Sequence, residues 1–256
     1  MFNKSLLTDG IYFLTHPNNS FEQTYIDIRK KEGNLLTIPQ ILALPNSERD
    51  SAKWKMRKAS ADLFIYYLQK NSKANLLEIG CGNGWFCNYI SAKTTIDNIV
   101  GLDVNQFELT QAKNAFSENK KITWVYADIF TANIPENKFD VIVLNGSVQY
   151  FQNFDKLIKR LKQLLTVNGE IHILDSPFYH SKKEQAKAHK KTVEHYSSLE
   201  HPKMAAYYTP HLWQEANKYS PTIMYKQNTI NSMLRRIGIR FFIREQNPFC
   251  WIMIQL

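Results

Sequence analysis

A glycine-rich segment between an apolar run and a helical run constrains the fold of this chain more than any other stretch. Residues 75–86 read N-L-L-E-I-G-C-G-N-G-W-F, with glycines at alternate positions after the apolar run. This order predicts a β-strand, a sharp turn and a helix that begins at Trp85. Glycines let the backbone turn tightly and approach a ligand closely, and the free amides at the start of a helix favour a negative group. The segment therefore predicts a ligand-binding loop at the end of a strand.

The spacing of the glycines distinguishes between classes of cofactor. A dinucleotide-binding loop needs a third glycine three residues after the second, but Trp85 stands three residues after Gly82. With Glu78 two residues ahead of the first glycine, E-I-G-C-G-N-G resembles the first motif of class I S-adenosylmethionine-dependent methyltransferases. The resemblance implies that the loop wraps the methionine half of S-adenosyl-L-methionine, with Glu78 and the Gly80 carbonyl near its ammonium group. The loop residues implied in cofactor binding are Gly80, Cys81, Gly82 and Gly84.

Acidic residues end the next two predicted strands. Residues 96–104 predict a second strand that ends in Asp103. An acid about twenty residues beyond a glycine loop suits a ribose, because one carboxylate can accept hydrogen bonds from both hydroxyls. Residues 122–130 predict a third strand that ends at Asp128. The resemblance implies that Asp103, with Val104 next to it, contacts the ribose, and that Asp128 and the Ile129 amide contact the adenine.

A continuous apolar run at residues 139–146 predicts a central parallel strand. The resemblance implies that its end, Asn145 and Gly146, lies beside the transferable methyl group. The next residues, G-S-V-Q-Y-F, resemble the fourth-strand exit of the small-molecule, ubiquinone-biosynthesis-like branch of the family, where a histidine pair is common. Gln149 and Tyr150 stand there instead, which leaves the general base open. The segment also lacks the Asn-Pro-Pro-Tyr or Asp-Pro-Pro-Tyr type of sequence that positions an amino group of a nucleic-acid base.

Alternating strands and helices predict an α/β fold with a doubly wound, Rossmann-like sheet, whose ligands bind beyond the carboxyl ends of the strands. The resemblance implies seven strands in the order 3-2-1-4-5-7-6, with the last strand antiparallel. The other predicted elements are helices at residues 51–70, 105–119 and 154–165, a left-handed cap at Asn168-Gly169, a fifth strand at 169–175, and a tail with a helix at 228–237 and strands at 238–245 and 249–256.

Two of these helices have apolar faces that predict which side chains are buried. In the helix at residues 51–70, Trp54 and Arg57 could reach the cofactor. The favoured interpretation is a core tryptophan and a surface arginine, because aromatic side chains at helical spacing usually pack in the core. In the helix at residues 105–119, the predicted inner side consists of apolar residues, namely Phe107, Leu109, Ala112, Ala115 and Phe116.

We expect a helical N-terminal extension at residues 1–50 and a methyltransferase domain at residues 51–256, with a cap inserted at residues 177–226 over the active site. The cap carries five of the seven histidines and several tyrosines. His180, just beyond the fifth strand, is the first candidate for a base, and Tyr150 is the second. Cysteines and acids at zinc-ligand spacing are absent, so no metal site is predicted.

The net charge of +9 keeps nucleic acid as a possible partner, because a basic surface binds phosphates. Lysines and arginines occur along the whole chain, however, and predict solvated helix faces. No apolar run is long enough to span a bilayer and the first residues lack a signal-peptide core, so we expect no membrane span and a cytoplasmic protein. Cys81, Cys87 and Cys250 are interpreted as small buried packing residues. The sequence carries no signal for an oligomeric state.

These patterns favour an S-adenosylmethionine-dependent methyltransferase that acts on a small organic acceptor, with transfer to oxygen favoured. An acceptor that ionises by itself, such as a carboxylate, would need no base. One alternative is a methyltransferase of RNA or protein that uses the basic surface. A second alternative is a cofactor-binding protein without transfer activity, against which the presence of Glu78, Asp103 and Asp128 argues.

Overall fold

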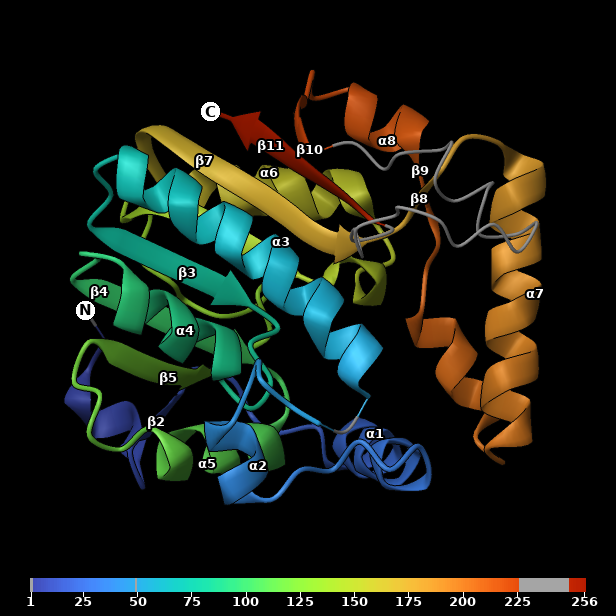
Figure 1. The fold of residues 1–256 in the computed structure, drawn as a ribbon, viewed down its shortest axis with the longest axis horizontal. Helices are drawn as coiled ribbons and strands as arrows, with labels where there is room; N and C mark the ends of the chain where they lie inside the picture. Colours follow the sequence, from blue (N-terminus) through green and yellow to red (C-terminus); the bar gives the residue numbers. More distant parts are fainter. Residues whose placement is uncertain (1, 49, 226–248) are drawn as a thin grey trace.

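The computed structural model describes residues 2–48, 50–225 and 249–256, and its centre is one mixed sheet of nine strands (Figure 1). The strands lie in the order β1-β2-β5-β4-β3-β6-β7-β11-β10. Their bounds are β1 Leu7–Thr8, β2 Ile11–Phe13, β3 Asn75–Ile79, β4 Asn98–Asp103, β5 Ile122–Tyr126, β6 Phe139–Asn145, β7 Leu165–Ser176, β10 Thr222–Tyr225 and β11 Cys250–Gln255. A separate pair consists of β8 Phe178–Tyr179 and β9 His211–Leu212.

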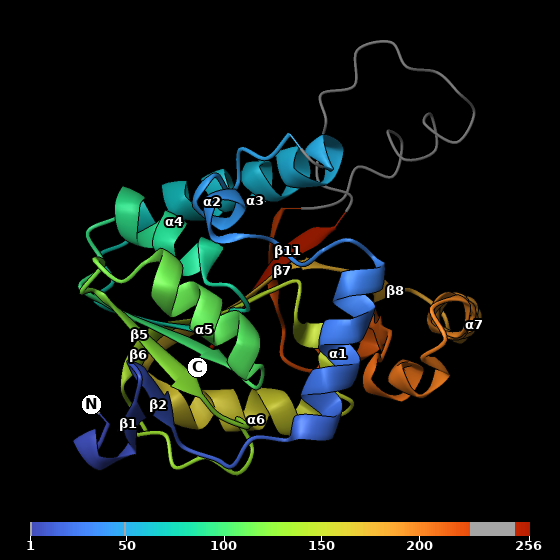
Figure 2. The ribbon, with the colours of Figure 1, turned by 90° about the horizontal axis from the view of Figure 1, so that it is seen from below.

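Helices cover both faces of this sheet, as the view from below shows (Figure 2). One buried cluster joins α3, α4 and α5 to the sheet, and a second joins α6 to its opposite face. Along β3, Leu76 belongs to the first cluster and Leu77 to the second, because successive side chains of a strand point to opposite faces. The helices are η1 Lys4–Leu6, α1 Asn19–Lys31, α2 Ile38–Leu42, α3 Ser51–Lys70, α4 Trp85–Lys93, α5 Gln106–Ala115, η2 Val148–Tyr150, α6 Phe154–Leu164, α7 Lys182–Ser198, η3 Pro202–Tyr207 and α8 Trp213–Asn217.

The predicted fold class is confirmed in its central part. The strands β5, β4, β3, β6, β7 and β11 have the expected order 3-2-1-4-5-7, and β11 runs antiparallel to β7. The sheet has nine strands rather than seven, because β1 and β2 extend one edge. At the other edge β10, from the end of the predicted cap, pairs with β11. The strand expected at residues 238–245 and the helix expected at residues 228–237 lie outside the described residues.

The N-terminal extension is more regular than the sequence indicated. Its strand β2 runs parallel to β5, with Ile11 paired to Trp124 and Phe13 to Tyr126. The helix α1 follows, and it buries Ile28 together with the acidic Glu22. Because polar side chains occupy part of its inner face, the apolar periodicity of α1 is weak.

The predicted left-handed cap of α6 is wrong. The helix ends at Leu164, and Leu165 is already extended. Asn168 does adopt a left-handed conformation, with φ 67°, but it lies inside β7. The register between β6 and β7 shifts in this region, from Phe139 opposite Leu165 to Val141 opposite Glu170. The turn residues therefore produce an irregularity within the strand rather than the end of a helix.

His172 of β7 is completely buried. Its Nδ1 accepts a hydrogen bond from Trp251 Nε1 at 3.1 Å, so Nε2 carries the proton and donates to Glu170 at 3.2 Å. Burial lowers the pKa of His172, which favours this neutral form.

Among the described helices, none combines the length and apolar character that crossing a bilayer requires.

Candidate active site

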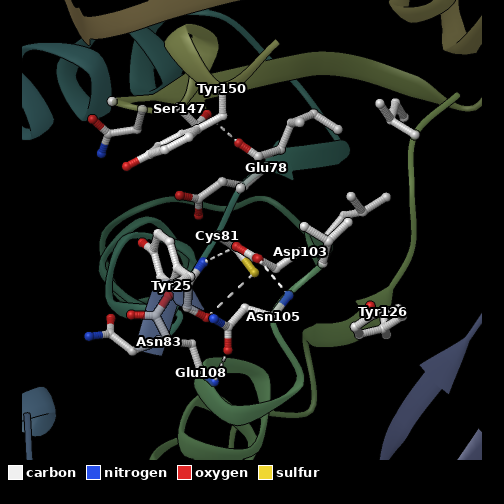
Figure 3. Close-up of a pocket in the computed structure, with 18 of the residues that line it drawn as sticks. Tyr25, Glu78, Cys81, Asn83, Asp103, Asn105, Glu108, Tyr126, Ser147 and Tyr150 are labelled. Carbon is white, nitrogen blue, oxygen red and sulfur yellow. Dashed lines mark hydrogen bonds between the residues drawn. The ribbon is translucent and has the colours of Figure 1, made fainter. Parts of the chain in front are cut away.

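A cavity of about 870 Å³ opens at the carboxyl ends of β3, β4, β5 and β6. Its floor is the glycine loop between β3 and α4, and its walls come from α1, the first turns of α3 and the exit of β6. This is the position where doubly wound sheets bind their ligands. Figure 3 shows how side chains from these distant parts of the sequence converge on the loop.

The glycine loop is held open toward the cavity by hydrogen bonds to the neighbouring strand. The amides of Gly80 and Cys81 donate to the Leu102 carbonyl at 2.8 and 3.1 Å, and the Gly82 amide donates to Asp103 Oδ2 at 2.7 Å. Gly82 has φ 50°, and a Cβ there would lie 3.0 Å from Glu108 Oε2. Glycine is needed at this position because the backbone is left-handed and Glu108 lies directly beside it.

Two predicted acids of the cavity, the buried Glu78 and the half-buried Asp103, have raised pKa values. Burial raises the pKa of Glu78 to about 8, although its Oε2 accepts a hydrogen bond from the Cys87 thiol at 2.9 Å. Burial, and then the charge of Glu108, raise the pKa of Asp103 to about 7. A carboxylate in such a place gains from a cationic or hydrogen-bond-donating ligand, because the ligand offsets the cost of burying its charge.

The cavity continues past the end of β5, where Asp128 and Ile129 lie. The backbone amide of Asp128 donates to Thr15 Oγ1 of the N-terminal extension at 3.0 Å. The side-chain oxygen Oδ1 of Asp128 accepts a hydrogen bond from the Phe130 amide at 2.9 Å. Arg160 Nε donates to the Ile129 carbonyl at 3.0 Å. These bonds fix the turn whose predicted role is to hold the adenine.

The predicted cofactor residues meet in this cavity with one exception. Gly84 does not line it, because it packs beneath the loop, where an added Cβ would lie 2.4 Å from Trp124 Cη2. The predicted residues that line the cavity are Glu78, Gly80, Cys81, Gly82, Asp103, Val104, Asp128, Ile129, Asn145 and Gly146.

The N-terminal helix α1 forms one wall of the cavity and is tied to the sheet. Glu22 is 7% exposed, and its two oxygens accept hydrogen bonds from the Tyr126 hydroxyl and the Gln106 amide, each at 2.8 Å. This arrangement brings Tyr25 and Arg29 of the same helix into the lining. No site residue of this extension was predicted from the sequence, since its polar inner face gives no clear helical pattern.

Asn105 and Glu108 are lining residues that the sequence analysis missed. The Nδ2 atom of Asn105 is buried and has no hydrogen-bond partner among the described residues, although its Oδ1 accepts from the Glu108 amide at 2.9 Å. Burial raises the pKa of Glu108, whose Oε1 lies 3.8 Å from Arg29 Nε. A buried amide donor without a partner, next to two acids, is suited to a polar ligand with hydroxyl and amino groups.

Comparisons with known proteins match this part of the chain. The model of the methyltransferase domain family matches residues 77–173, which contain the glycine loop, Glu78, Asp103 and Asp128. Residues 77–173 are thus identified as a methyltransferase domain of the class I S-adenosylmethionine-dependent superfamily.

Relatives of this methyltransferase domain share its core. An uncharacterized methyltransferase of Mycobacterium tuberculosis is 28% identical over 99 residues, which are 39% of this chain and 49% of that protein. The malonyl-[acyl-carrier protein] O-methyltransferase 2 of Ilyobacter polytropus is 30% identical over 115 residues, which are 45% of this chain and 44% of that protein. The chain thus spans about half the length of the curated relatives it matches.

A solved structure shares the fold over a longer part of the methyltransferase chain. The geranyl diphosphate C-methyltransferase of Streptomyces coelicolor superposes with a TM-score of 0.57 at 12% identity, covering 78% of this chain and 79% of that one. The arrangement of sheet and helices is therefore shared even where the sequences have diverged.

The two residues predicted as bases, Tyr150 and His180, have different placements. Tyr150 lines the cavity, and burial raises the pKa of its hydroxyl well above the usual value. His180 is not among the lining residues. Its ring stacks on Trp213 at 5.9 Å, and its amide donates to Glu184 at 2.9 Å. The prediction of His180 as a base does not fit this placement, because β8 carries the chain away from the cavity.

The segment at residues 177–225 touches the cavity at one point in the described chain, Tyr207, whereas ten lining residues come from the N-terminal extension at residues 1–50. The segment packs instead behind α1, where Tyr196 and Met204 form a small buried cluster with Ile28.

The interpretation of Arg57 as a surface residue is wrong, since Arg57 lines the cavity beside Trp54. The three cysteines are buried and unpaired, as expected.

Proposed function

We propose that this protein transfers a methyl group from S-adenosyl-L-methionine to an oxygen atom of a small organic acceptor. The observation that carries the proposal is the convergence of Glu78, Asp103 and Asp128 around one cavity, at the ends of three neighbouring strands. The cavity volume of about 870 Å³ lies in the range of small-molecule sites and leaves room beside a cofactor for an acceptor of modest size.

Methyl transfer from this cofactor requires little proton transfer by the protein. When bound, the cofactor supplies a methyl group already activated by its positive sulfur. The chain contributes orientation, proximity and exclusion of water. We propose that Glu78 accepts from the ammonium end, Asp103 from the ribose, and Asp128 with Ile129 from the adenine edge. Asn145, Gly146 and Tyr150 then border the space for the acceptor.

The burial of Tyr150 argues that it borders the acceptor without acting as a base. A phenol with a raised pKa is protonated at neutral pH and is a poor proton acceptor. This favours an acceptor that is already ionised, or acidic enough to react without help. One relative, the malonyl-[acyl-carrier protein] O-methyltransferase 2 of Ilyobacter polytropus, is named for transfer to oxygen, which supports this proposal.

The test is transfer of tritiated methyl from S-adenosyl-L-methionine to a panel of carboxylic acids, phenols and amines, with products identified by mass spectrometry. We expect labelled product from at least one oxygen acceptor, and Tyr150→Phe should keep its rate within about threefold, because no proton passes through the hydroxyl. Transfer exclusively to amines, or a loss of more than about a hundredfold in Tyr150→Phe with intact cofactor binding, would contradict the proposal.

We also propose that the N-terminal extension at residues 1–50 and the segment at residues 177–226 act together as the cover of the methyltransferase domain. Lys31 at the end of α1 pairs with Glu200 at 2.6 Å, and His195 of α7 lies 2.9 Å from Glu32. In this arrangement α1 borders the cavity directly, and the 177–226 segment supports it from outside.

A further inference from the structure

A continuous surface of aromatic side chains lines the cavity on the side of α1. Phe21 and Tyr25 lie one turn apart on this helix, and their ring centroids are 6.3 Å apart. Phe21 also packs against Tyr207, with 4.9 Å between the centroids. Tyr25 meets the ring of Tyr150 edge-on at 6.2 Å (Figure 3). These four residues form one wall of the cavity, the ring wall, from three segments that are distant in the sequence.

The ring wall is supported from behind by the buried cluster that joins α1 to the segment at residues 177–225. The members of this cluster are Ile28, Tyr196, Met204 and Ala205. Phe21, Tyr25 and Tyr150 pack against it, but they are only half-buried, because they also face the cavity. Aromatic surface that borders a cavity gains free energy when an apolar ligand covers it and displaces water. The supporting cluster holds the rings in place for such a ligand.

The ring wall begins beside the proposed place of methyl transfer. Tyr150 follows the end of β6 and stands four residues after Gly146, which lines the same cavity. The acids proposed to hold the cofactor lie at the ends of β3, β4 and β5, whereas the ring wall comes from α1, η2 and η3. A cofactor held by those acids therefore leaves the ring wall to the acceptor.

Charges beside the ring wall restrict the kind of ligand that it accepts. Aromatic rings suit two kinds of occupant, another planar ring and an organic cation. Arg29 lies one turn after Tyr25, with its Cζ 6.0 Å from the centroid of that ring, and Arg57 lines the same cavity. Glu108 approaches Arg29 to 3.8 Å, so it offsets the charge of that arginine alone. The remaining positive charge disfavours a cation and favours a ring that carries an acidic oxygen.

We propose that Phe21 and Tyr25 are specificity-determining residues that select a planar aromatic acceptor. The ring of the acceptor packs against the ring wall, and its acidic oxygen lies beside the end of β6. The acceptor class is then an aromatic carboxylate or a phenol, and an aliphatic acid is a poor substitute. The identity of the occupant as the methyl acceptor rests on the proposed function, whereas the preference of the ring wall for an aromatic ring does not.

Pairs of acids that differ only in the saturation of the ring test this preference. Calorimetry compares benzoate with cyclohexanecarboxylate, and 2-naphthoate with its fully saturated counterpart, on protein saturated with S-adenosylhomocysteine. Both members of a pair carry the same carboxylate, so the comparison isolates the contribution of the flat ring. Wild type should prefer the aromatic member of at least one pair by about fivefold or more, the size expected for ring contacts beyond the area that they bury.

Leucine variants remove the rings and keep an apolar wall. The double variant Phe21→Leu, Tyr25→Leu should bind the two members of each pair to within about twofold of each other, and each single variant should give an intermediate ratio. Tyr25→Phe keeps the ring and should retain the wild-type preference. Tyr66→Leu is the matched control, because Tyr66 is 62% exposed on α3, outside the cavity lining, and its loss should leave the preference unchanged.

The proposal is overturned if wild type binds the members of every pair equally, if it binds no aromatic acid, or if the leucine variants keep the wild-type preference. Saturable binding of tetramethylammonium without binding of the aromatic acids would also overturn it, since the ring wall would then hold a cation. Methyl transfer confined to aliphatic acids would leave the proposed function standing and contradict this inference. Should S-adenosylhomocysteine not bind, the proposed function fails, and the same pairs titrated into the free protein still test the ring wall.

Discussion

Gly84→Ala is expected to destabilise the folded protein by about 2–5 kcal/mol. The residue has φ 74°, which costs a side-chain-bearing residue about 1–2 kcal/mol. The new methyl group would also lie 2.4 Å from Trp124 Cη2 and 2.8 Å from Ala112 Cβ, and overpacking of this kind costs about 1–3 kcal/mol more. Urea denaturation followed by circular dichroism measures the loss directly.

Gly146→Ala is the matched control for this prediction. Gly146 is also left-handed, with φ 67°, but the nearest atom to its added Cβ is the Asp175 carbonyl oxygen at an ordinary 3.6 Å. This variant should lose only the backbone contribution, about 1–2 kcal/mol. If the two variants lose the same stability, the close packing of α4 and α5 against Trp124 is not as the structure places it.

Asp103→Asn is expected to weaken S-adenosylhomocysteine binding by about 1–3 kcal/mol, or roughly 10- to 100-fold, because a charged acceptor for the ribose hydroxyls is lost. The wild-type affinity should depend on pH in a defined direction. Since the pKa of Asp103 is raised to about 7 and that of Glu78 to about 8, the free protein holds these protons below those values. Binding to the ionised acids should therefore tighten as the pH rises from 6 to 8.

Calorimetry at several pH values tests both parts of this prediction. Asp103→Asn should start weaker and show a shallower rise with pH, because Glu78 alone still titrates in that range. Asp128→Asn is a useful comparison and should lose less, since Asp128 already accepts a backbone hydrogen bond from Phe130. A wild-type affinity that does not change with pH, together with unchanged binding in Asp103→Asn, would show that Asp103 does not touch the ligand.

The strand, loop and helix at residues 75–93 could be predicted from the sequence because each part has a local cause. An apolar run forms β3, glycines permit the left-handed turns, and Trp85 begins α4. The strand that ends at Asp103 was predicted for the same reason, as a buried parallel strand reads as an apolar run. The position of these acids at one edge then follows from parallel pairing.

Side chains that face the cavity from helices were harder to predict, because an apolar pattern does not mark a polar inner face. In α5 the prediction placed Phe107 inside, but Phe107 is 41% exposed and Glu108 is buried. The capping side chain of Asn105 sets this rotation, since its Oδ1 binds the Glu108 amide. A buried acid beside Arg29 and the cavity does not follow from an apolar pattern, because acids are seldom buried without a partner.

The position of Arg57 in the cavity lining could not be predicted from its neighbours in the sequence. Its sequence context, K-W-K-M-R-K, has the composition of a solvated helix face. The first turns of α3 extend beyond the sheet, so a side chain pointing inward there meets a cavity instead of the core. His180 shows the opposite error, as closeness in sequence to the end of β7 did not bring it to the cavity.

The central claim is that this cavity binds S-adenosyl-L-methionine and not a dinucleotide. Trp85 fills the place of the third glycine of a dinucleotide loop, and it is 7% exposed and packed edge-on against Trp54 at 5.3 Å. Calorimetric titration of the wild-type protein with S-adenosylhomocysteine and, separately, with nicotinamide adenine dinucleotide tests the claim most directly. We predict one site of micromolar affinity for S-adenosylhomocysteine and no heat of binding for the dinucleotide. Saturable dinucleotide binding with no response to S-adenosylhomocysteine would contradict it.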